Sequence, residues 1–185
     1  MPIKDESAVI EAARSLDQDA LVMIFDEYAP ALYKYMLRLG SASQEADQIV
    51  GDVFARLLEK FTEGKGPREN LRSYLFQTAY HLVVDHARER KRIAPLDDAI
   101  AIREDMKPVQ SRSEEKMLLD ELSLAMEREL TEEQRNVIVL RFQEDFSLQE
   151  TAEIIGKNVN AVKALQNRGI NKLRQVLGGA YGGQA

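Results

Sequence analysis

The sequence contains no cysteine, so it can form neither a disulfide nor a zinc site with thiolate ligands. Long apolar runs are also absent, and no stretch approaches the roughly 20 residues that a membrane span requires. The N-terminal stretch MPIKDESAVIEAAR is charged and lacks the apolar region of a signal peptide. These absences fit a reducing compartment and predict a cytoplasmic protein that does not insert into a membrane.

Positive charge is in deficit, since 25 Lys and Arg stand against 31 Asp and Glu, a formal net charge of -6. Because the phosphate backbone attracts positive charge, this balance argues against a protein that coats nucleic acid without specificity. Any DNA binding must therefore be local. The hydrophobic share of 44% is enough to build packed cores.

Helical periodicity dominates what is present. Apolar residues recur three and four positions apart almost everywhere, and no segment shows the alternation of a strand. Breakers and caps predict eight helices, near residues 6–16, 17–39, 43–62, 70–91, 113–130, 131–143, 147–155 and 159–177. In the second of them one stripe is expected to be buried, made of Leu21, Ile24, Phe25, Tyr28, Leu32, Tyr35, Met36 and Leu39. The predicted fold class is all-α.

The segment 95–112 interrupts this pattern, with two prolines, four acids and no sustained periodicity. Such a composition is typical of an extended linker. We therefore expect two small helical domains, 1–92 and 113–177, joined by an acidic linker at 93–112 and followed by a flexible tail at 178–185.

Basic residues gather in two places. One cluster ends the fourth helix, and the other lies in or just before the last helix, which contains no acid. The first comprises Arg88, Arg90, Lys91 and Arg92, and the second comprises Lys157, Lys163, Arg168, Lys172 and Arg174. Both are candidate phosphate-facing surfaces, although either cluster alone also fits a solvated helix face.

The sequence after residue 130 has the pattern of a helix-turn-helix. Two capping boxes are expected, in which a hydroxyl and the side chain three residues on satisfy helix-end amides: Thr131 with Gln134, and Ser147 with Glu150. Gly156 can adopt the left-handed conformation of a tight turn, after which Asn158 can cap the next helix.

The outward face of that last helix is suited to DNA. Its expected outward residues are Asn160, Lys163, Asn167 and Arg168, which can contact base edges and phosphates in a major groove. Helical hairpins with a glycine turn also occur in proteins that never touch DNA. The second helix is basic whereas the first carries acids, and this difference favours a DNA-binding function.

The C-terminal string resembles region 4 of the sigma-70 superfamily, specifically its small extracytoplasmic-function group. The residues that match are Leu130, Gln134, Arg135, Val137, Leu140, Arg141, Phe146, Ser147, Glu150, Ala152, Gly156, Val162 and Lys163. Thr131 stands where the family usually has proline. Ala164 and Leu165 replace the usual Ser-Arg after Val-Lys.

The N-terminal part resembles region 2 of the same family. The matching residues are Tyr28, Pro30, Leu32, Ala46, Asp47, Asp52, Val53, Phe54, Ala79, Asp85 and Arg88. Gly51 replaces the usual glutamine, Tyr74 the tryptophan and His81 the asparagine. The resemblance spans residues 20–177 and keeps both domains in the family's order and separation.

This resemblance implies an alternative sigma factor that binds bacterial core RNA polymerase, recognises minus 35 and minus 10 promoter elements and promotes strand opening. It implies three sets of contacts. Core polymerase would contact Asp47, Gln48, Asp52 and Phe54. The melted minus 10 element would contact Asn70, Arg72, Tyr74, Tyr80, His81, Arg88, Lys91 and Arg92, with the loop 62–70 beside them. The minus 35 duplex would contact Arg141, Lys157, Asn160, Lys163, Asn167, Arg168 and Lys172. An anti-sigma protein is a further candidate partner.

Two other readings compete. His81, Asp85 and His86 lie within six residues on one helix and could suggest a metalloenzyme. However, His86 points about 100° away from Asp85, and Asp85 can simply pair with Arg88. We therefore expect no catalytic residue, no metal and no cofactor. The second reading is a helix-turn-helix regulator that acts on duplex DNA without being a polymerase subunit.

Overall fold

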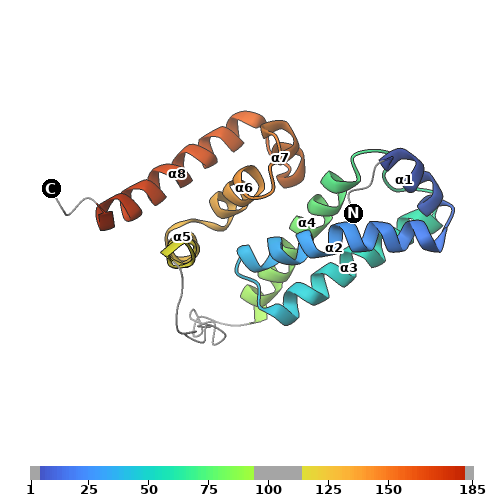
Figure 1. Cartoon of the computed structure of the whole chain (residues 1–185), viewed down its shortest axis with the longest axis horizontal. Coiled ribbons are helices and arrows are strands. Elements are labelled where there is room, and N and C mark those ends of the chain that lie inside the picture. The colour runs from blue at the N-terminus through green and yellow to red at the C-terminus, as the bar shows by residue number, and fades with distance from the viewer. Residues whose placement is uncertain (1–4, 94–113, 182–185) are drawn as a thin grey trace. The chain divides into compact units, whose positions relative to one another are not determined.

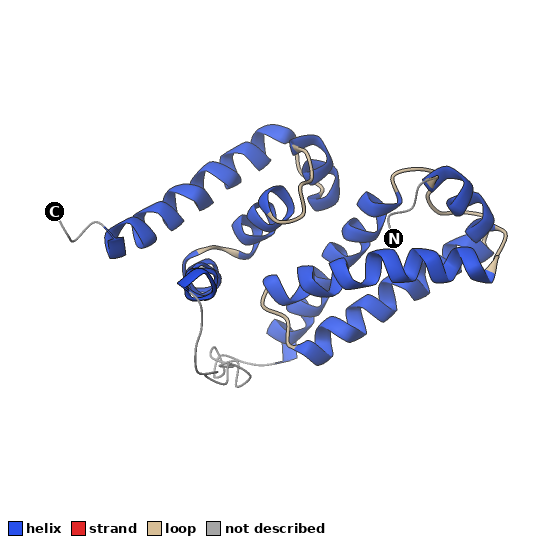
Figure 2. Cartoon of the chain, viewed as in Figure 1, coloured by secondary structure: helices blue, strands red, loops and turns tan. Residues whose placement is uncertain are grey.

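The computed structural model describes residues 5–93 and 114–181, and within these ranges all regular structure is helical (Figures 1 and 2). The elements are α1 (Glu6–Arg14), α2 (Gln18–Arg38), α3 (Ser43–Thr62), α4 (Leu71–Ile93), α5 (Glu114–Glu129), α6 (Glu132–Phe142), α7 (Leu148–Ile155) and α8 (Val159–Tyr181). The all-α prediction is confirmed, as is each of the eight helices. The expected linker, apart from Ile93, and the last four residues of the expected tail lie outside the described residues.

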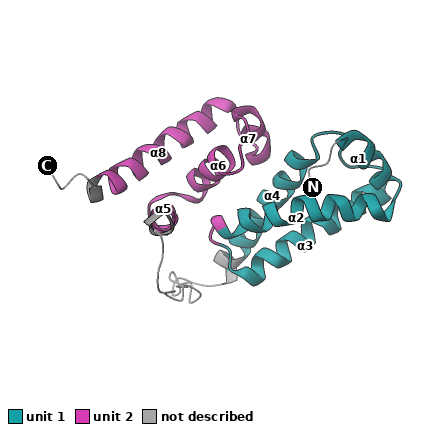
Figure 3. Ribbon diagram, in the orientation of Figure 1, with its two compact units in different colours: residues 1–37, 41–95 teal, residues 38–40, 96–185 magenta. Residues whose placement is uncertain are grey.

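The chain divides into two compact units, one of residues 1–37 and 41–95, the other of residues 38–40 and 96–185 (Figure 3). In the first unit, the buried side chains of α1 to α4 form one core. Tyr35 of α2 and Phe76 of α4, both fully buried, lie with ring centroids 5.1 Å apart. Ile10 and Ala13 of α1 are buried in the same unit, and α1 contacts α3.

The predicted buried stripe of α2 is wrong at Phe25. Ile24, Leu32, Tyr35 and Met36 are fully buried as expected, whereas the Phe25 side chain is 48% exposed. Spacing of three and four residues includes the edges of an apolar stripe as well as its centre. Since Phe25 lies at one edge, packing rather than spacing decides its exposure.

In the second unit, α8 packs on α5, α6 and α7. Gly169 permits the contact with α6, because a Cβ at this position would lie 3.2 Å from Cγ1 of Ile138. Arg135 ties α6 to the end of α5, since its guanidinium donates to the backbone oxygens of Met126 at 3.2 Å and Glu127 at 2.7 Å. These contacts hold the three-helix support on which α8 lies.

Local capping fixes the helix-turn-helix as the sequence predicts. Both capping boxes are present, at Thr131 and at Ser147. Gly156 ends α7 at φ 66°, and the Asn158 side chain accepts a hydrogen bond from the amide of Ala161 at 2.8 Å. The turn between α7 and α8 is therefore determined by residues within it.

The end of α8 differs from the prediction. The helix was expected to stop at residue 177, but it continues to Tyr181 through Gly178 and Gly179. Glycine in a helix costs about 1 kcal/mol relative to alanine and does not forbid the conformation. The expected tail thus begins within α8.

Candidate nucleic-acid and partner interfaces

The outward face of α3 carries the residues expected to bind a polymerase. Asp47 and Gln48 are exposed, and Asp52 and Phe54 are partly exposed. Gly51 lies among them, with nothing within 4 Å of where its Cβ would be. Since these residues are three and four positions apart, they share one side of the helix, and that side presents two carboxylates and an amide, with Arg56 one turn beyond Asp52.

An apolar cleft of about 390 Å³ adjoins this face, between α2 and α3. Its lining residues are Leu21, Val22, Ile24, Phe25, Asp26, Phe54, Leu57 and Leu58. The Phe25 and Phe54 rings lie 4.8 Å apart, centroid to centroid, at an interplanar angle of 53°. Leu58 remains 43% exposed. Periodicity did not predict this cleft, because only the packing of α2 against α3 leaves Phe25 at the surface.

The face of α4 brings together most of the side chains expected at the minus 10 element. Asn70, His81, Arg88 and Arg92 are exposed and Tyr74 is partly exposed, and their spacing places them along one side of the helix. Gln77 lies on the same side, a residue that the sequence analysis missed although the same spacing includes it. The side chain of Lys91 lies outside the described ones.

Two of the expected residues lie elsewhere. The Arg72 guanidinium stacks 5.3 Å above the Phe76 ring, on the opposite side of α4 from His81. Tyr80 is only 9% exposed, and its ring meets that of His81 edge-on at 5.7 Å. Both therefore support the face of α4 from the side or from behind, and direct base contact by either stays a prediction.

The metal reading finds no support among the side chains that the structure describes, which contain no group of three or more potential ligands. Asp85 lies 3.7 Å from the Arg88 guanidinium, as expected. His86 instead approaches Glu45 of α3, with Nδ1 4.0 Å from the carboxylate. The residues of the suspected cluster thus take separate partners.

The outward stripe of α8 carries Asn160, Lys163, Asn167 and Arg168, all exposed. Val162, Gly169 and Leu173 are buried instead. Asn171 and Arg174 extend the exposed stripe, and helical spacing could have included both among the candidates. The described part of the helix contains no acidic residue.

Three other cations expected at DNA have contacts within the protein. Arg141 donates to the carbonyl of Phe146 and, at 3.3 Å, to Oε1 of Gln166, so it holds the turn between α6 and α7. Lys157 Nζ lies 2.9 Å from a Glu133 carboxylate oxygen. Lys172 Nζ donates to the backbone oxygen of Glu129 at 2.9 Å. Phosphate contacts by these three stay predictions.

These features define a helical protein with an acidic helix face in one unit and a helix-turn-helix in the other. The Sigma-70 region 2 family matches residues 24–93, and the family described as Sigma-70, region 4 matches residues 128–175. Together the matches cover more than half of the chain.

Several curated proteins are similar over most of the sequence. The ECF RNA polymerase sigma factor BldN of Streptomyces coelicolor is 28% identical over 173 residues, which are 91% of this chain and 64% of BldN. The chain thus spans slightly less than two thirds of that relative. The ECF RNA polymerase sigma factors SigX and SigW of Bacillus subtilis are each 27% identical, over 85% and 91% of this chain and 84% and 94% of their own lengths.

Solved structures share the fold. The sigma factor RpoE from Bartonella quintana, in complex with the anti-sigma factor NepR, matches 84% of this chain and 94% of its own, with a TM-score of 0.66 and 24% identity. CnrH, in complex with the cytosolic domain of CnrY, matches 95% and 99% with a TM-score of 0.71 and 20% identity. The chain belongs to the sigma-70 family, and its relatives place it among the extracytoplasmic-function sigma factors. It is an alternative RNA polymerase sigma factor.

A search of the described helices for a membrane span found none that is both long enough and apolar enough.

Proposed function

We propose that this sigma factor binds core polymerase through α3, reads the melted minus 10 element with α4 and the loop before it, and reads the minus 35 duplex with α8. The observation that carries the proposal is the separation of charge between two exposed faces. The α3 face presents Asp47 and Asp52, with Arg56 as the nearest cation along the helix, and the described part of α8 presents cations and amides without an acid. A basic protein surface and the DNA backbone are the respective complements.

On α3 the acidic residues would provide specificity and the cleft would provide binding energy. Acidic side chains steer a basic partner and exclude acidic ones. Most of the affinity at an interface comes from a few large side chains buried at its centre. Phe25, Phe54 and Leu58 offer such a centre, beside Asp47 and Gln48. A partner helix with an apolar ridge and basic flanks would fit both parts.

On α4 the proposed ligand is single-stranded DNA. An extruded base requires donors and acceptors, and flanking bases require surfaces on which to stack. Asn70 offers the polar groups, and the Tyr74 and His81 rings offer the surfaces. Arg88 and Arg92, further along the same side, would contact the phosphates that follow.

On α8 the proposed ligand is the major groove of duplex DNA. Lysine and arginine pair with guanine, and asparagine with adenine, through groups that only this groove displays uniquely. Asn160, Lys163, Asn167 and Arg168 supply these side chains from one stripe, and the capped turn after Gly156 sets the angle at which α8 enters.

The remaining parts of the proposal follow from this division. Residues 1–92 would serve as region 2 and residues 113–177 as region 4, with 93–112 as the linker, which limited proteolysis should cut first. The protein would act in the cytoplasm, where core polymerase transcribes, and would perform no catalysis of its own. An anti-sigma protein is a further proposed partner, since the structural relative RpoE is in complex with the anti-sigma factor NepR.

Run-off transcription with core polymerase on a promoter library, with and without this protein, tests the proposal. We expect initiation only when both are present, from sites that share minus 35 and minus 10 sequences. Asp47→Lys with Asp52→Lys should weaken core binding, more strongly at low salt. Glu11→Lys, a charge reversal on exposed α1, is the control and should leave core affinity unchanged.

DNA binding without any affinity for core polymerase would contradict the proposal and support a conventional helix-turn-helix regulator. Unchanged core affinity in the doubly reversed protein would remove α3 from the polymerase interface while leaving the α8 assignment intact.

A further inference from the structure

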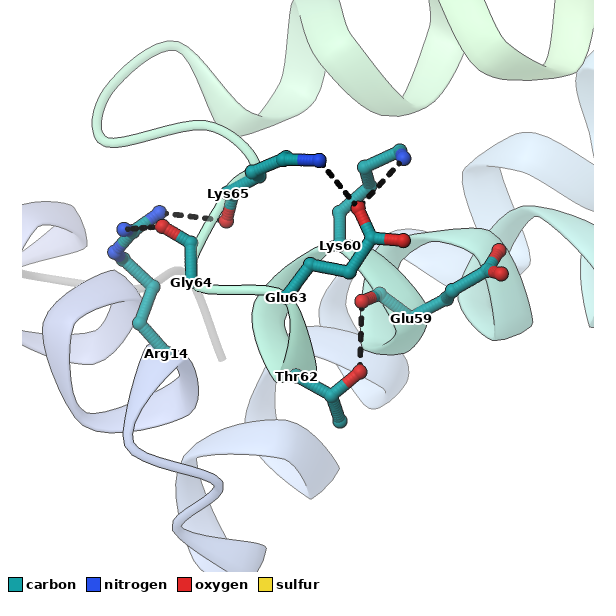
Figure 4. A network of polar contacts seen from close by, with 7 residues as sticks. All are labelled: Arg14, Glu59, Lys60, Thr62, Glu63, Gly64 and Lys65. Atoms are coloured by element: carbon teal, nitrogen blue, oxygen red, sulfur yellow. Dashed lines mark hydrogen bonds and ion pairs between the residues drawn. The ribbon is translucent and has the colours of Figure 1, made fainter.

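The loop between α3 and α4 is held by one side chain from α1 (Figure 4). The Arg14 guanidinium donates to three consecutive backbone oxygens, those of Gly64 at 2.9 Å, Lys65 at 2.8 Å and Gly66 at 3.2 Å. Figure 4 draws the first two of these bonds. It also lies 6.0 Å above the ring of Phe61. A planar guanidinium has five donors in a fixed arrangement, so one side chain can satisfy several carbonyls through two of its nitrogens.

The same loop is also closed from within. The amide of Gly64 donates to the Phe61 oxygen at 2.9 Å, and the amide of Lys65 donates to the Lys60 oxygen at 2.8 Å. This pair is a Schellman motif, which requires a left-handed residue, and Gly64 supplies it at φ 70°. Gly66, at φ 93°, lies so close to Phe61 that a Cβ there would come within 3.0 Å of the ring. The conformation of the loop is therefore closely determined.

Because the carbonyls face Arg14, the loop presents side chains on its other edge. Lys65, Arg68 and Asn70 are all exposed. Asn70 has a left-handed φ of 54°, and its backbone oxygen accepts from the amide of Tyr74 at 3.1 Å. The loop thus sets where the first residues of the α4 face lie.

Arg14 contributes little that the core of α1 does not already provide. Ile10 and Ala13 are buried and attach the helix, while two of the three Arg14 hydrogen bonds are exposed. The region 2 match begins at residue 24, ten residues after Arg14. A contact that adds little to the core but fixes a loop beside a recognition surface has a geometric role.

We propose that Arg14 is a positioning residue for promoter reading: it fixes the loop 63–70 in the conformation in which the loop and Asn70 discriminate bases of the minus 10 element. This inference rests on the proposed function of α4 and the loop. Arg14 itself touches no DNA. Its effect is to remove the loop conformations that would accept incorrect bases, since a pre-ordered site loses less entropy on binding its preferred ligand.

The experiment compares Arg14→Gln and Arg14→Lys with Lys34→Gln, which removes an equal charge from an exposed site on α2. The full-length proteins are measured for amide hydrogen exchange, core affinity and run-off transcription on a library randomised at the minus 10 element. Asn70→Ala is measured on the same library as a test of the surface itself.

We expect Arg14→Gln to speed exchange at the amides of Gly64 and Lys65 and to leave core affinity unchanged. Discrimination at one or two minus 10 positions should fall about five- to tenfold, near the lower limit of what one base contact provides. Arg14→Lys, which can keep one or two of the carbonyl bonds, should be intermediate, and Lys34→Gln should match the parent protein.

Faster amide hydrogen exchange with unchanged base preference in Arg14→Gln would overturn the inference. The loop would then be looser without any effect on the recognition of minus 10 bases. If Asn70→Ala nevertheless flattens the preference, the proposed minus 10 surface stands and only the role of Arg14 fails. If neither variant changes the preference, the assignment of this surface to the minus 10 element fails, and the inference fails with it.

Discussion

Gly169 of α8 lies directly against Ile138 of α6, so that a Cβ at position 169 would come within 3.2 Å of Cγ1 and 3.4 Å of Cδ1 of that isoleucine. The absence of a side chain here sets how closely α8 approaches its support. The contact therefore links the packing of the second unit to the direction in which the exposed stripe of α8 points.

Gly169→Leu should destabilise the second unit by about 2 kcal/mol, because overpacking a close helix contact forces the backbones apart. Gly178→Leu is the matched control on the same helix, since nothing lies within 4 Å of its Cβ position, and it should be neutral or slightly stabilising. Thermal unfolding of both variants measures the difference. Equal midpoints would show that α6 and α8 adjust to the added side chain without cost.

Gly51→Ala should have the opposite effect on the first unit. Gly51 is in the middle of α3, is exposed and has nothing within 4 Å of its Cβ position. Alanine should therefore add about 1 kcal/mol of stability, which raises the unfolding midpoint by about 4 °C or more in a unit of this size. Calorimetry of the free protein checks this. A lower midpoint would mean that the helix depends on glycine for a reason other than space.

Tyr28 should make the first unit sensitive to alkali. Burial, and then the nearby Glu6 carboxylate, which accepts a hydrogen bond from the phenol at 3.2 Å, raise the pKa of Tyr28 from 10.0 to about 12. Because the folded-state pKa lies above the unfolded value, the stabilisation is complete below pH 10 and is lost as the pH rises from 10 toward 12.

Titration of the phenolate absorbance should show one late tyrosine that disappears in Tyr28→Phe. Glu6→Gln should restore only part of the ordinary pKa, since burial is the larger cause and remains. If the Tyr28→Phe variant loses a tyrosine that titrates at the ordinary pKa, and the late-titrating phenol remains, the prediction is wrong.

Arg168→Ala and Lys172→Ala should separate base reading from phosphate contact on α8. Arg168 lies on the outward stripe, so its loss should cost roughly 1–3 kcal/mol on the preferred minus 35 sequence and flatten discrimination at one position. Lys172 lies nearer the helix end, where it can reach only phosphate. Lys172→Ala should therefore weaken binding to every sequence alike and lower the slope of affinity against salt concentration by about one.

Binding to a minus 35 library at two salt concentrations distinguishes the two effects. Lys172 also bonds the Glu129 carbonyl at the end of α5, so the unfolding midpoint of each variant is measured alongside, to separate lost DNA contacts from lost stability. Equal, sequence-independent losses for the two variants would mean that α8 is merely basic.

Local chemistry explains why so much of the fold could be predicted. Ser147 and Glu150 can satisfy each other's amides wherever the helix lies, and Gly156 adopts its left-handed conformation without any tertiary contact. Helix starts, turns and the order of elements depend on residues a few positions apart, which the sequence displays directly. The outward stripe of α8 was likewise predictable, because one helix face follows from spacing and from the apolar residues opposite.

Contacts between distant segments decided the rest. Phe25 has the spacing of a core residue, yet the packing of α2 on α3 leaves it exposed beside Phe54. Tyr80 was expected at DNA, yet tertiary packing leaves it only 9% exposed, and its contact with a base stays a prediction. The sequence alone determined the helices, their caps and the family, because these depend on neighbours along the chain. Only the tertiary structure could bring Arg14 to three carbonyls some fifty residues away, because that contact requires α1 to be packed on α3.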